Sequence, residues 1–213
     1  MGDREADRLA NRRPNVPASM PVGWRADAPA DAHARDSDPA LLEVPPGAMV
    51  VLIGPAGSGK STLAAKHIPP DAVLSSDAFR AQTGRGEADQ SVTGAAFAAL
   101  HRALERRLAG GRTTVVDATS LTRRARLALL DRARRANAVP VALVLDLPAE
   151  LMIARNATRI GRVVPDAAVQ QQLALMRLIS DDDLMSEGFA VVRRLRSPEE
   201  VAGLRLMSDL SRS

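Results

Sequence analysis

A glycine-rich loop that ends in lysine and serine is the strongest chemical signal in this sequence. It fits the pattern G-x-x-x-x-G-K-[ST] and consists of Gly54, Pro55, Ala56, Gly57, Ser58, Gly59, Lys60 and Ser61, followed by Thr62. Glycines let backbone N–H groups converge on phosphate oxygens, and the start of a helix adds positive potential. Lys60 should reach the β- and γ-phosphates, and Ser61 should bind Mg²⁺. The loop therefore predicts binding of a nucleoside triphosphate such as ATP, without saying how the triphosphate is used.

The residues around this loop favour the same interpretation. An apolar run over Val50–Ile53 precedes it, and a helical pattern from about Lys60 to His67 follows it. A chance glycine-rich turn would need neither element, whereas a phosphate-binding loop lies between a strand and a helix.

A carboxylate, Asp117, ends a second apolar run. At the carboxyl end of a strand it would lie at the sheet edge where open α/β proteins bind ligands, and it could orient the shell of a Mg²⁺ ion or a reacting group. The alternative is that Asp117 caps the helix that starts a few residues later. The position at the sheet edge favours the functional interpretation.

The segment LSSDAFR follows another predicted strand and places Asp77 and Arg80 at the same sheet edge. A carboxylate there could accept the proton of an attacking hydroxyl while the γ-phosphoryl group is transferred. Arg80 lies three residues on, on the same helix face, and could hold an anion of the acceptor. Alternatively, Asp77 is a helix N-cap and Arg80 its surface partner. The two residues alone do not decide between these interpretations.

Three arginines follow the fourth predicted strand in the segment LMIARNATRIGRVVP, namely Arg155, Arg159 and Arg162. Like charges four residues apart on a helix repel, and such an arrangement becomes favourable when a polyanion closes against it. Glycine and proline interrupt the segment, so we expect a lid that closes over ATP and excludes water. The other arginine-rich segment is expected to be a solvated helix face, with Arg123, Arg124, Arg126, Arg132, Arg134 and Arg135.

Strand-like and helix-like segments alternate along the chain and must position these residues. Strands are expected over 50–53, 72–75, 113–116, 139–145 and 189–195. Helices are expected over 60–67, 78–81, 93–109 with Thr93 as N-cap, 121–136, from about 148, 166–178 and 198–204. Repeated βα units predict an α/β fold, in which helices cover both faces of a parallel five-stranded sheet in three layers.

The segment before the first strand differs in composition. Residues 1–46 are rich in Pro, Ala, Asp and Arg without apolar periodicity, which predicts a disordered leader. The folded domain is expected over 47–205, with its lid at about 155–166, followed by a C-terminal tail over 206–213.

Composition limits the class of protein further. The chain has no cysteine, and no stretch reaches the roughly 18 apolar residues of a membrane span. A cytoplasmic protein without membrane partners is the default expectation. The net charge is +4, and residues 1–46 contribute −2 of it, so the remainder is strongly basic. This balance favours an anionic partner, although codon usage in a GC-rich genome would also enrich arginine. Aromatic residues make up only 2%, so no stacking platform for bases is evident.

Several segments together resemble a known family. GPAGSGKST, LSSDAFR, DQSVTGAAFAALHRALERRLAGGRTTVVDAT, RNATRIGR and EGFAVV…SPEEV occur in the order seen in the 5′-kinase domain of bacterial polynucleotide kinase–phosphatase–ligase RNA-repair enzymes. The resemblance covers about Met49 to Val201, and the run from Asp89 to Thr119 is its most specific part.

The resemblance implies a P-loop kinase-type fold that transfers the γ-phosphate of ATP to the 5′-OH of RNA or DNA, with Mg²⁺. It assigns Lys60 and Ser61 to ATP and Mg²⁺, and it assigns the lid to Arg155, Arg159 and Arg162. It also implies an acceptor site formed by Asp77 as the general base, Arg80, Asp117 and Thr119. Ser120 stands where the family often has Asn. The family's phosphatase and ligase domains are missing from this sequence, so we expect either a kinase that has changed its acceptor or one that works with separate phosphatase and ligase partners.

Two other functions fit the same loop. One is a P-loop kinase of a small-molecule hydroxyl acceptor. The other is a nucleotide-dependent ATPase or switch without an acceptor, against which the pairing of Asp77 with Arg80 argues, because a switch needs a positioned water instead.

Overall fold

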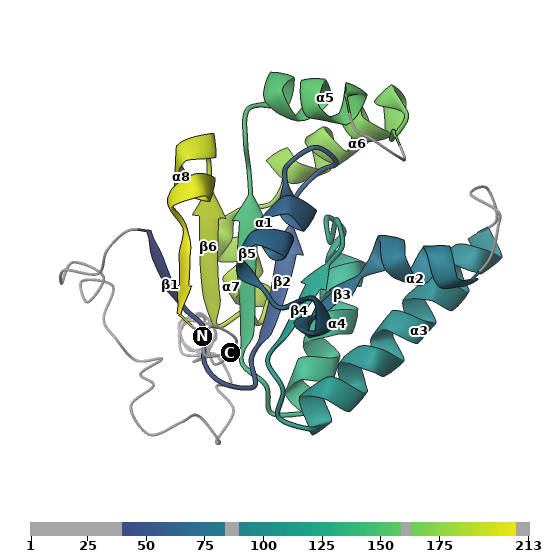
Figure 1. Cartoon of the computed structure of the whole chain (residues 1–213), viewed down its shortest axis with the longest axis vertical. Helices are drawn as coiled ribbons and strands as arrows, with labels where there is room; N and C mark the ends of the chain where they lie inside the picture. Colours follow the sequence, from purple (N-terminus) through teal and green to yellow (C-terminus); the bar gives the residue numbers. More distant parts are fainter. Residues whose placement is uncertain (1–39, 84–89, 159–162, 208–213) are drawn as a thin grey trace, which may run out of the picture.

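The computed structural model describes residues 40–83, 90–158 and 163–207. Five parallel strands form the central sheet in the order β3-β4-β2-β5-β6 (Figure 1). Their bounds are Met49–Ile53 for β2, Val73–Ser75 for β3, Thr114–Asp117 for β4, Pro140–Leu145 for β5 and Val191–Leu195 for β6. Every residue of β2, β4 and β5 is buried, as expected for parallel strands that are covered on both faces.

Helices follow the strands along the chain and cover both faces of the sheet. Their bounds are Lys60–His67 for α1, Ser76–Thr83 for α2, Gln90–Ala109 for α3, Arg123–Arg135 for α4, Ala149–Ala157 for α5, Asp166–Arg177 for α6, Asp181–Glu187 for α7 and Pro198–Gly203 for α8, with a short 3₁₀ turn over Pro70–Ala72. No helix within the described ranges is both long enough and apolar enough to cross a membrane.

The alternation of side chains along β2 separates two cores. Val51 and Ile53 pack with Leu100 and Leu104 of α3 on one face of the sheet. Val50 and Leu52 pack with residues of α1 on the other face. The three-layer α/β sandwich with a parallel five-stranded sheet is thus confirmed.

Most expected elements are present, with some differences at their ends. The helix over 60–67 has the predicted bounds. Helix α3 begins at Gln90, so the prediction of Thr93 as its N-cap is wrong. Helix α7 was not predicted, because its first turn is a run of three aspartates that hides the helical pattern. Its start is nevertheless encoded by a capping box between Ser180 and Asp183.

The predicted boundaries of the leader and the tail are corrected by a small second sheet. Strand β1, Leu41–Glu43, pairs in parallel with β7, Arg205–Met207. Leu42 and Val44 are buried in the same core as Leu204, and this apolar contact orders a segment whose composition predicted disorder. The predicted leader over 1–46 and tail over 206–213 therefore each include part of this sheet, and residues 1–39 and 208–213 lie outside the described ranges.

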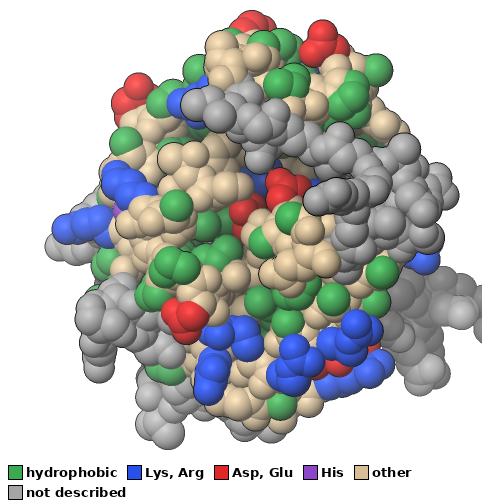
Figure 2. Space-filling view, turned by 45° about the vertical axis from the view of Figure 1, so that its right-hand side comes forward, with side chains coloured by type: hydrophobic (Ala, Val, Ile, Leu, Met, Phe, Trp, Pro, Cys, Tyr) green, Lys and Arg blue, Asp and Glu red, His purple; other side chains and the backbone are tan. Residues whose placement is uncertain are grey.

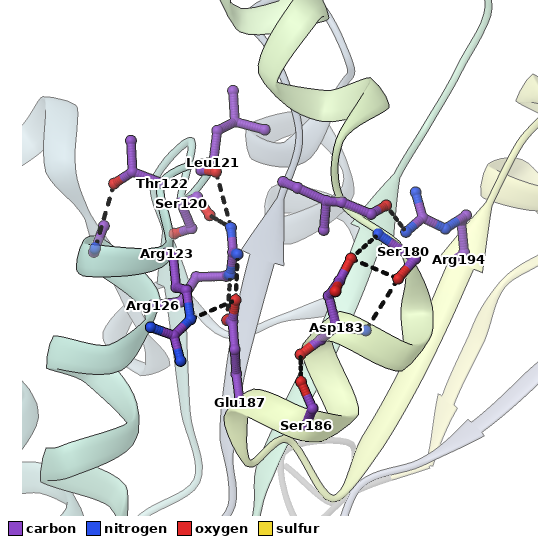
Figure 3. A network of polar contacts seen from close by, with 12 residues as sticks. Ser120, Leu121, Thr122, Arg123, Arg126, Ser180, Asp183, Ser186, Glu187 and Arg194 are labelled. Atoms are coloured by element: carbon purple, nitrogen blue, oxygen red, sulfur yellow. Dashed lines mark hydrogen bonds and ion pairs between the residues drawn. The ribbon is translucent and has the colours of Figure 1, made fainter.

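One arginine of α4 was assigned to the wrong environment. Arg126 was expected on a solvated face but is only 3% exposed. Its guanidinium donates to both carboxylate oxygens of Glu187 on α7, at 2.7 and 2.6 Å, and to the carbonyls of Ser120 and Leu121 (Figure 3). This forked pair connects the start of α4 to the end of α7, and each of the three guanidinium nitrogens has a hydrogen-bond partner.

Candidate active site

The phosphate-binding loop is shaped by glycines at the start of α1. Gly59, with φ +92°, is the N-cap of α1. Gly57 has φ +78°, and a Cβ atom there would lie 2.1 Å from the carbonyl oxygen of Met152 on α5. No other residue fits at position 57, because both the backbone conformation and the contact with α5 exclude a side chain.

Lys60 lies within the loop that it is expected to serve. Its side chain is buried, and its Nζ donates to the carbonyl oxygens of Gly54 and Pro55, both at 2.8 Å, and to Oγ of Ser58 at 3.3 Å. The loop therefore holds the ammonium group at its centre, where oxygen atoms of a triphosphate would meet it.

Ser61 and Asp117 meet across the sheet edge, as a shared role at a metal ion requires. The hydroxyl of Ser61 donates to Oδ2 of Asp117 at 2.7 Å. Asp117 ends β4 and is buried, while the N-cap of α4 is Thr122, whose hydroxyl accepts from Ala125 N. The alternative of Asp117 as a helix cap is therefore excluded. A hydroxyl and a carboxylate are hard oxygen donors that fit Mg²⁺.

Asp77 and Arg80 lie at the start of α2, directly after β3. The helix begins at Ser76, and Oγ of Ser75 accepts from Ala78 N at 3.5 Å, so Asp77 does not serve as the N-cap. The guanidinium of Arg80 pairs with the Asp77 carboxylate and contacts Oγ of Ser76. Half of the Asp77 side chain is exposed, so it is accessible to a second molecule.

One cleft of about 940 Å³ brings these predicted residues together. Its lining includes Ala56, Gly57, Gly59, Lys60, Ser61, Thr62, Asp77, Arg80, Asp117, Thr119 and Arg155. Gly54, Pro55 and Ser58 do not line it; they form the part of the loop that holds the Lys60 ammonium. Figure 2 shows acidic side chains beside a central hollow on this side of the molecule.

Helices α5 and α6 flank the segment over 155–166 in which a lid is expected. Asn156, which is buried, donates to the carbonyl of Val164 at 2.8 Å and accepts from its N–H at 3.1 Å. These two bonds hold the end of α5 next to the start of α6. Arg155 lines the cleft, whereas Arg159 and Arg162 lie outside the described residues, so their place in the lid stays a prediction.

Several residues of the cleft were not predicted from the sequence. Gln172 of α6 accepts a hydrogen bond from Ala56 N at 2.7 Å and so connects α6 to the loop. Phe97 of α3 also lines the cleft, although no stacking platform was expected. At the other end the lining includes Lys66, His67, Pro198, Val201 and Ala202. Only tertiary structure brings these elements together, and no motif in the sequence indicates them.

His67 is a titratable residue of the cleft lining. Burial, and then the charge of Lys66, lower the pKa of His67 below its usual value. Its Nε2 is buried and makes no hydrogen bond to any residue that the structure describes. Both effects favour the neutral form of the His67 imidazole.

The fold and this cleft together define a P-loop nucleotide-binding protein with a kinase-like phosphotransferase fold. A protein-family model described as an AAA domain matches residues 49–179, and the chain belongs to this family. A search of curated proteins found no match.

Solved structures with the same fold include a sugar kinase, a chain of an RNA repair complex and Kti12. A sugar kinase from Janibacter sp. is 24% identical with a TM-score of 0.50, and the match covers 72% of this chain and 89% of that one. A chain of the Pnkp1/Rnl/Hen1 RNA repair complex is 23% identical with a TM-score of 0.52, over 64% of this chain and 45% of that one. Chaetomium thermophilum Kti12, solved with ADP-AlF3, is 15% identical with a TM-score of 0.55, over 73% and 94%. At these identities the likeness shows the fold.

Proposed function

We propose that this protein is an ATP- and Mg²⁺-dependent polynucleotide 5′-hydroxyl kinase. The observation that carries the proposal is the position of the Asp77–Arg80 pair in the cleft that also contains Lys60, Ser61 and Asp117. The lining thus combines residues that suit a triphosphate with a carboxylate beside a cation. In a site that binds a triphosphate, such a pair suits transfer to a second anionic molecule better than hydrolysis.

In the proposed reaction the 5′-hydroxyl oxygen of the acceptor attacks the γ-phosphorus, and the bond from that phosphorus to the β–γ bridging oxygen breaks. Asp77 accepts the hydroxyl proton, and ADP leaves. Lys60 and the lid arginines, Arg155 with Arg159 and Arg162, neutralise charge on the transferred group. Mg²⁺ would be held through Ser61, with Asp117 behind it, and would supply charge neutralisation at the phosphates.

The choice of a nucleic acid as acceptor rests on three supports. The first is the resemblance to the kinase domain of RNA-repair enzymes, which runs through Asp89–Thr119. The second is the basic surplus of the folded part. The third is the similarity to a chain of an RNA repair complex, of which this chain spans less than half the length. Separate phosphatase and ligase partners, and a cytoplasmic location, belong to the same proposal.

A small-molecule acceptor is the competing function, and the similarity to a sugar kinase favours it. An acceptor panel separates the two. Purified protein is incubated with γ-labelled ATP, Mg²⁺ and either a 5′-OH oligonucleotide, the same strand with a 5′-phosphate, or a set of sugars.

The proposal predicts label on the 5′-OH strand alone. Label on a sugar and none on the oligonucleotide would establish the competing function. Release of labelled phosphate without any labelled acceptor would indicate an ATPase.

A further inference from the structure

The exposed face formed by α3 and α4 is strongly basic. Between Ala98 and Asn137 the sequence has ten arginines and no lysine, against three acidic residues. Those at the surface are Arg102, Arg106, Arg112, Arg123, Arg124, Arg134 and Arg135, with Arg132 half-buried. Figure 2 shows Lys and Arg side chains gathered in the lower part of the face on which α3 comes forward. The chain's basic surplus is therefore concentrated on these two helices.

The ion pairs on this face leave part of its charge unbalanced. Arg132 pairs with Glu105, and Arg134 and Arg135 share Asp131. No carboxylate among the described residues lies within 4.0 Å of Arg102, Arg106, Arg112 or Arg124. Arg102 and Arg106 are i,i+4 neighbours on α3, an arrangement of like charges that is unfavourable until an anion binds between them.

Helix α3 connects this basic face to the active-site cleft. Phe97 lines the cleft, and the ring of His101 lies one turn further on, at 6.3 Å from the Phe97 ring. His101 in turn is close enough to Arg132 for that charge to lower the pKa of His101, after the larger effect of burial. From Phe97 to Arg106 the helix rises by about 14 Å and makes about two and a half turns, so a strand that passes from the cleft to Arg106 would cross α3 obliquely.

We infer that the α3–α4 face binds the sugar-phosphate backbone of the acceptor strand on the 3′ side of the end that Asp77 receives. The inference rests on the proposed function and deepens it, because it makes the substrate a strand of several nucleotides. Arginine suits this role because its planar fork matches phosphate oxygens. Contacts to phosphates alone give little sequence preference.

The test compares binding and transfer in variants that lie outside the catalytic residues. A fluorescein-labelled single-stranded 20-mer with a 5′-OH is titrated by anisotropy into wild type, Arg102→Ala/Arg106→Ala and Arg102→Lys/Arg106→Lys. Arg177→Ala removes an exposed arginine of α6 as a control. Thermal melting establishes that each variant is folded.

Arg102→Ala/Arg106→Ala should raise the Kd for the 20-mer about five- to tenfold. It should also reduce the slope of log K against log salt concentration by about 1.4, because two phosphate contacts are lost at ~0.7 each. The lysine pair should lose less, and Arg177→Ala should bind like wild type. KM for a dinucleotide acceptor should stay unchanged in all of them.

Three results would overturn the inference. The first is equal binding of the 20-mer by Arg102→Ala/Arg106→Ala and wild type, and the second is an equal loss of binding in Arg177→Ala. The third is absence of 20-mer binding by wild type at low salt. Transfer of label to the strand is measured separately from binding. If binding depended on Arg102 and Arg106 but no label were transferred, the proposed function would be contradicted, while the α3–α4 face would still be supported as a nucleic-acid binding surface.

Discussion

At the scale of single residues, Asp77 is the most consequential assignment. Replacement by asparagine keeps the size of the side chain and removes the proton acceptor. We predict that Asp77→Asn lowers the transfer rate by about 10²- to 10⁴-fold, the usual contribution of a general base. The Kd for ATP should stay near the wild-type value, because the residues that hold phosphate are elsewhere in the cleft. Steady-state transfer and equilibrium ATP binding measure the two effects.

Asp71→Asn is a matched control, since Asp71 is 82% exposed and its only described ion pair, to Arg107, spans 4.0 Å. This variant should transfer phosphate like wild type. Normal turnover in Asp77→Asn would show that the base assignment is wrong.

Two histidines with lowered pKa, His67 and His101, predict how the stability of the fold depends on pH. Burial lowers the pKa of both His67 and His101 below the value in the unfolded chain. Their contribution to stability is therefore complete above about pH 6.5 and is lost as the pH falls through the folded-state pKa. His101→Gln should reduce the drop in Tm between pH 7.5 and pH 5.5. An unchanged drop in that variant would contradict the role of His101.

Residues that act through local pattern were predictable from the sequence. The loop and the Asp77–Arg80 pair each follow a strand and Asp117 ends one, and the carboxyl ends of parallel strands meet at one edge. The environment of Arg126 was predicted wrongly, because spacing along one helix does not reveal the buried Glu187 on another helix with which Arg126 pairs. Gln172 and Phe97 reach the cleft only through tertiary packing.

At the scale of elements, the contact between the loop and α5 makes a specific prediction at Gly57. In Gly57→Ala the new Cβ would meet a backbone carbonyl that has no freedom to move alone. Strain of about 1–3 kcal/mol should push the loop away from α5, lowering Tm and weakening ATP binding at least tenfold. Differential scanning fluorimetry and ATP titration measure these effects.

Gly94→Ala is the control, since nothing lies within 4 Å of a Cβ at that position in α3. There alanine should raise stability by up to about 1 kcal/mol through its better helix propensity. Equal Tm and equal ATP affinity in Gly57→Ala and Gly94→Ala would show that the close contact between Gly57 and α5 is not needed for the loop conformation.

The buried pair between α4 and α7 makes a second prediction at this scale. Arg126→Met leaves the Glu187 carboxylate buried without its main partner, which should cost about 3–5 kcal/mol in the free energy of unfolding. Arg126→Met/Glu187→Leu should recover most of that loss, since no uncompensated charge remains. Chemical denaturation measures both.

Arg123 provides the comparison, because it is 71% exposed and lies 3.8 Å from the same carboxylate. Arg123→Ala should cost less than about 1 kcal/mol. A similar cost for Arg123→Ala and Arg126→Met would contradict the role given to the buried fork.

At the scale of the whole molecule, the order of helices and strands was predictable, but the pairing of β1 with β7 was not. Buried strands alternating with helices predicted a parallel sheet in three layers, because the hydrophobic pattern within each segment indicates whether it is a strand or a helix. The β1–β7 pair joins residues that are more than 160 positions apart, and each of its strands is three residues long. Segments this short have no measurable periodicity, so composition alone assigned them to a leader and a tail.

The central claim concerns what the whole cleft does with two substrates, and one measurement tests it most directly. A 5′-OH oligonucleotide is incubated with the protein, ATP and Mg²⁺, beside the same strand blocked by a 5′-O-methyl group, and both products are weighed by mass spectrometry. The account predicts the gain of one phosphate on the 5′-OH strand and none on the blocked strand. An unmodified 5′-OH strand, or equal phosphorylation of the blocked strand, would contradict it.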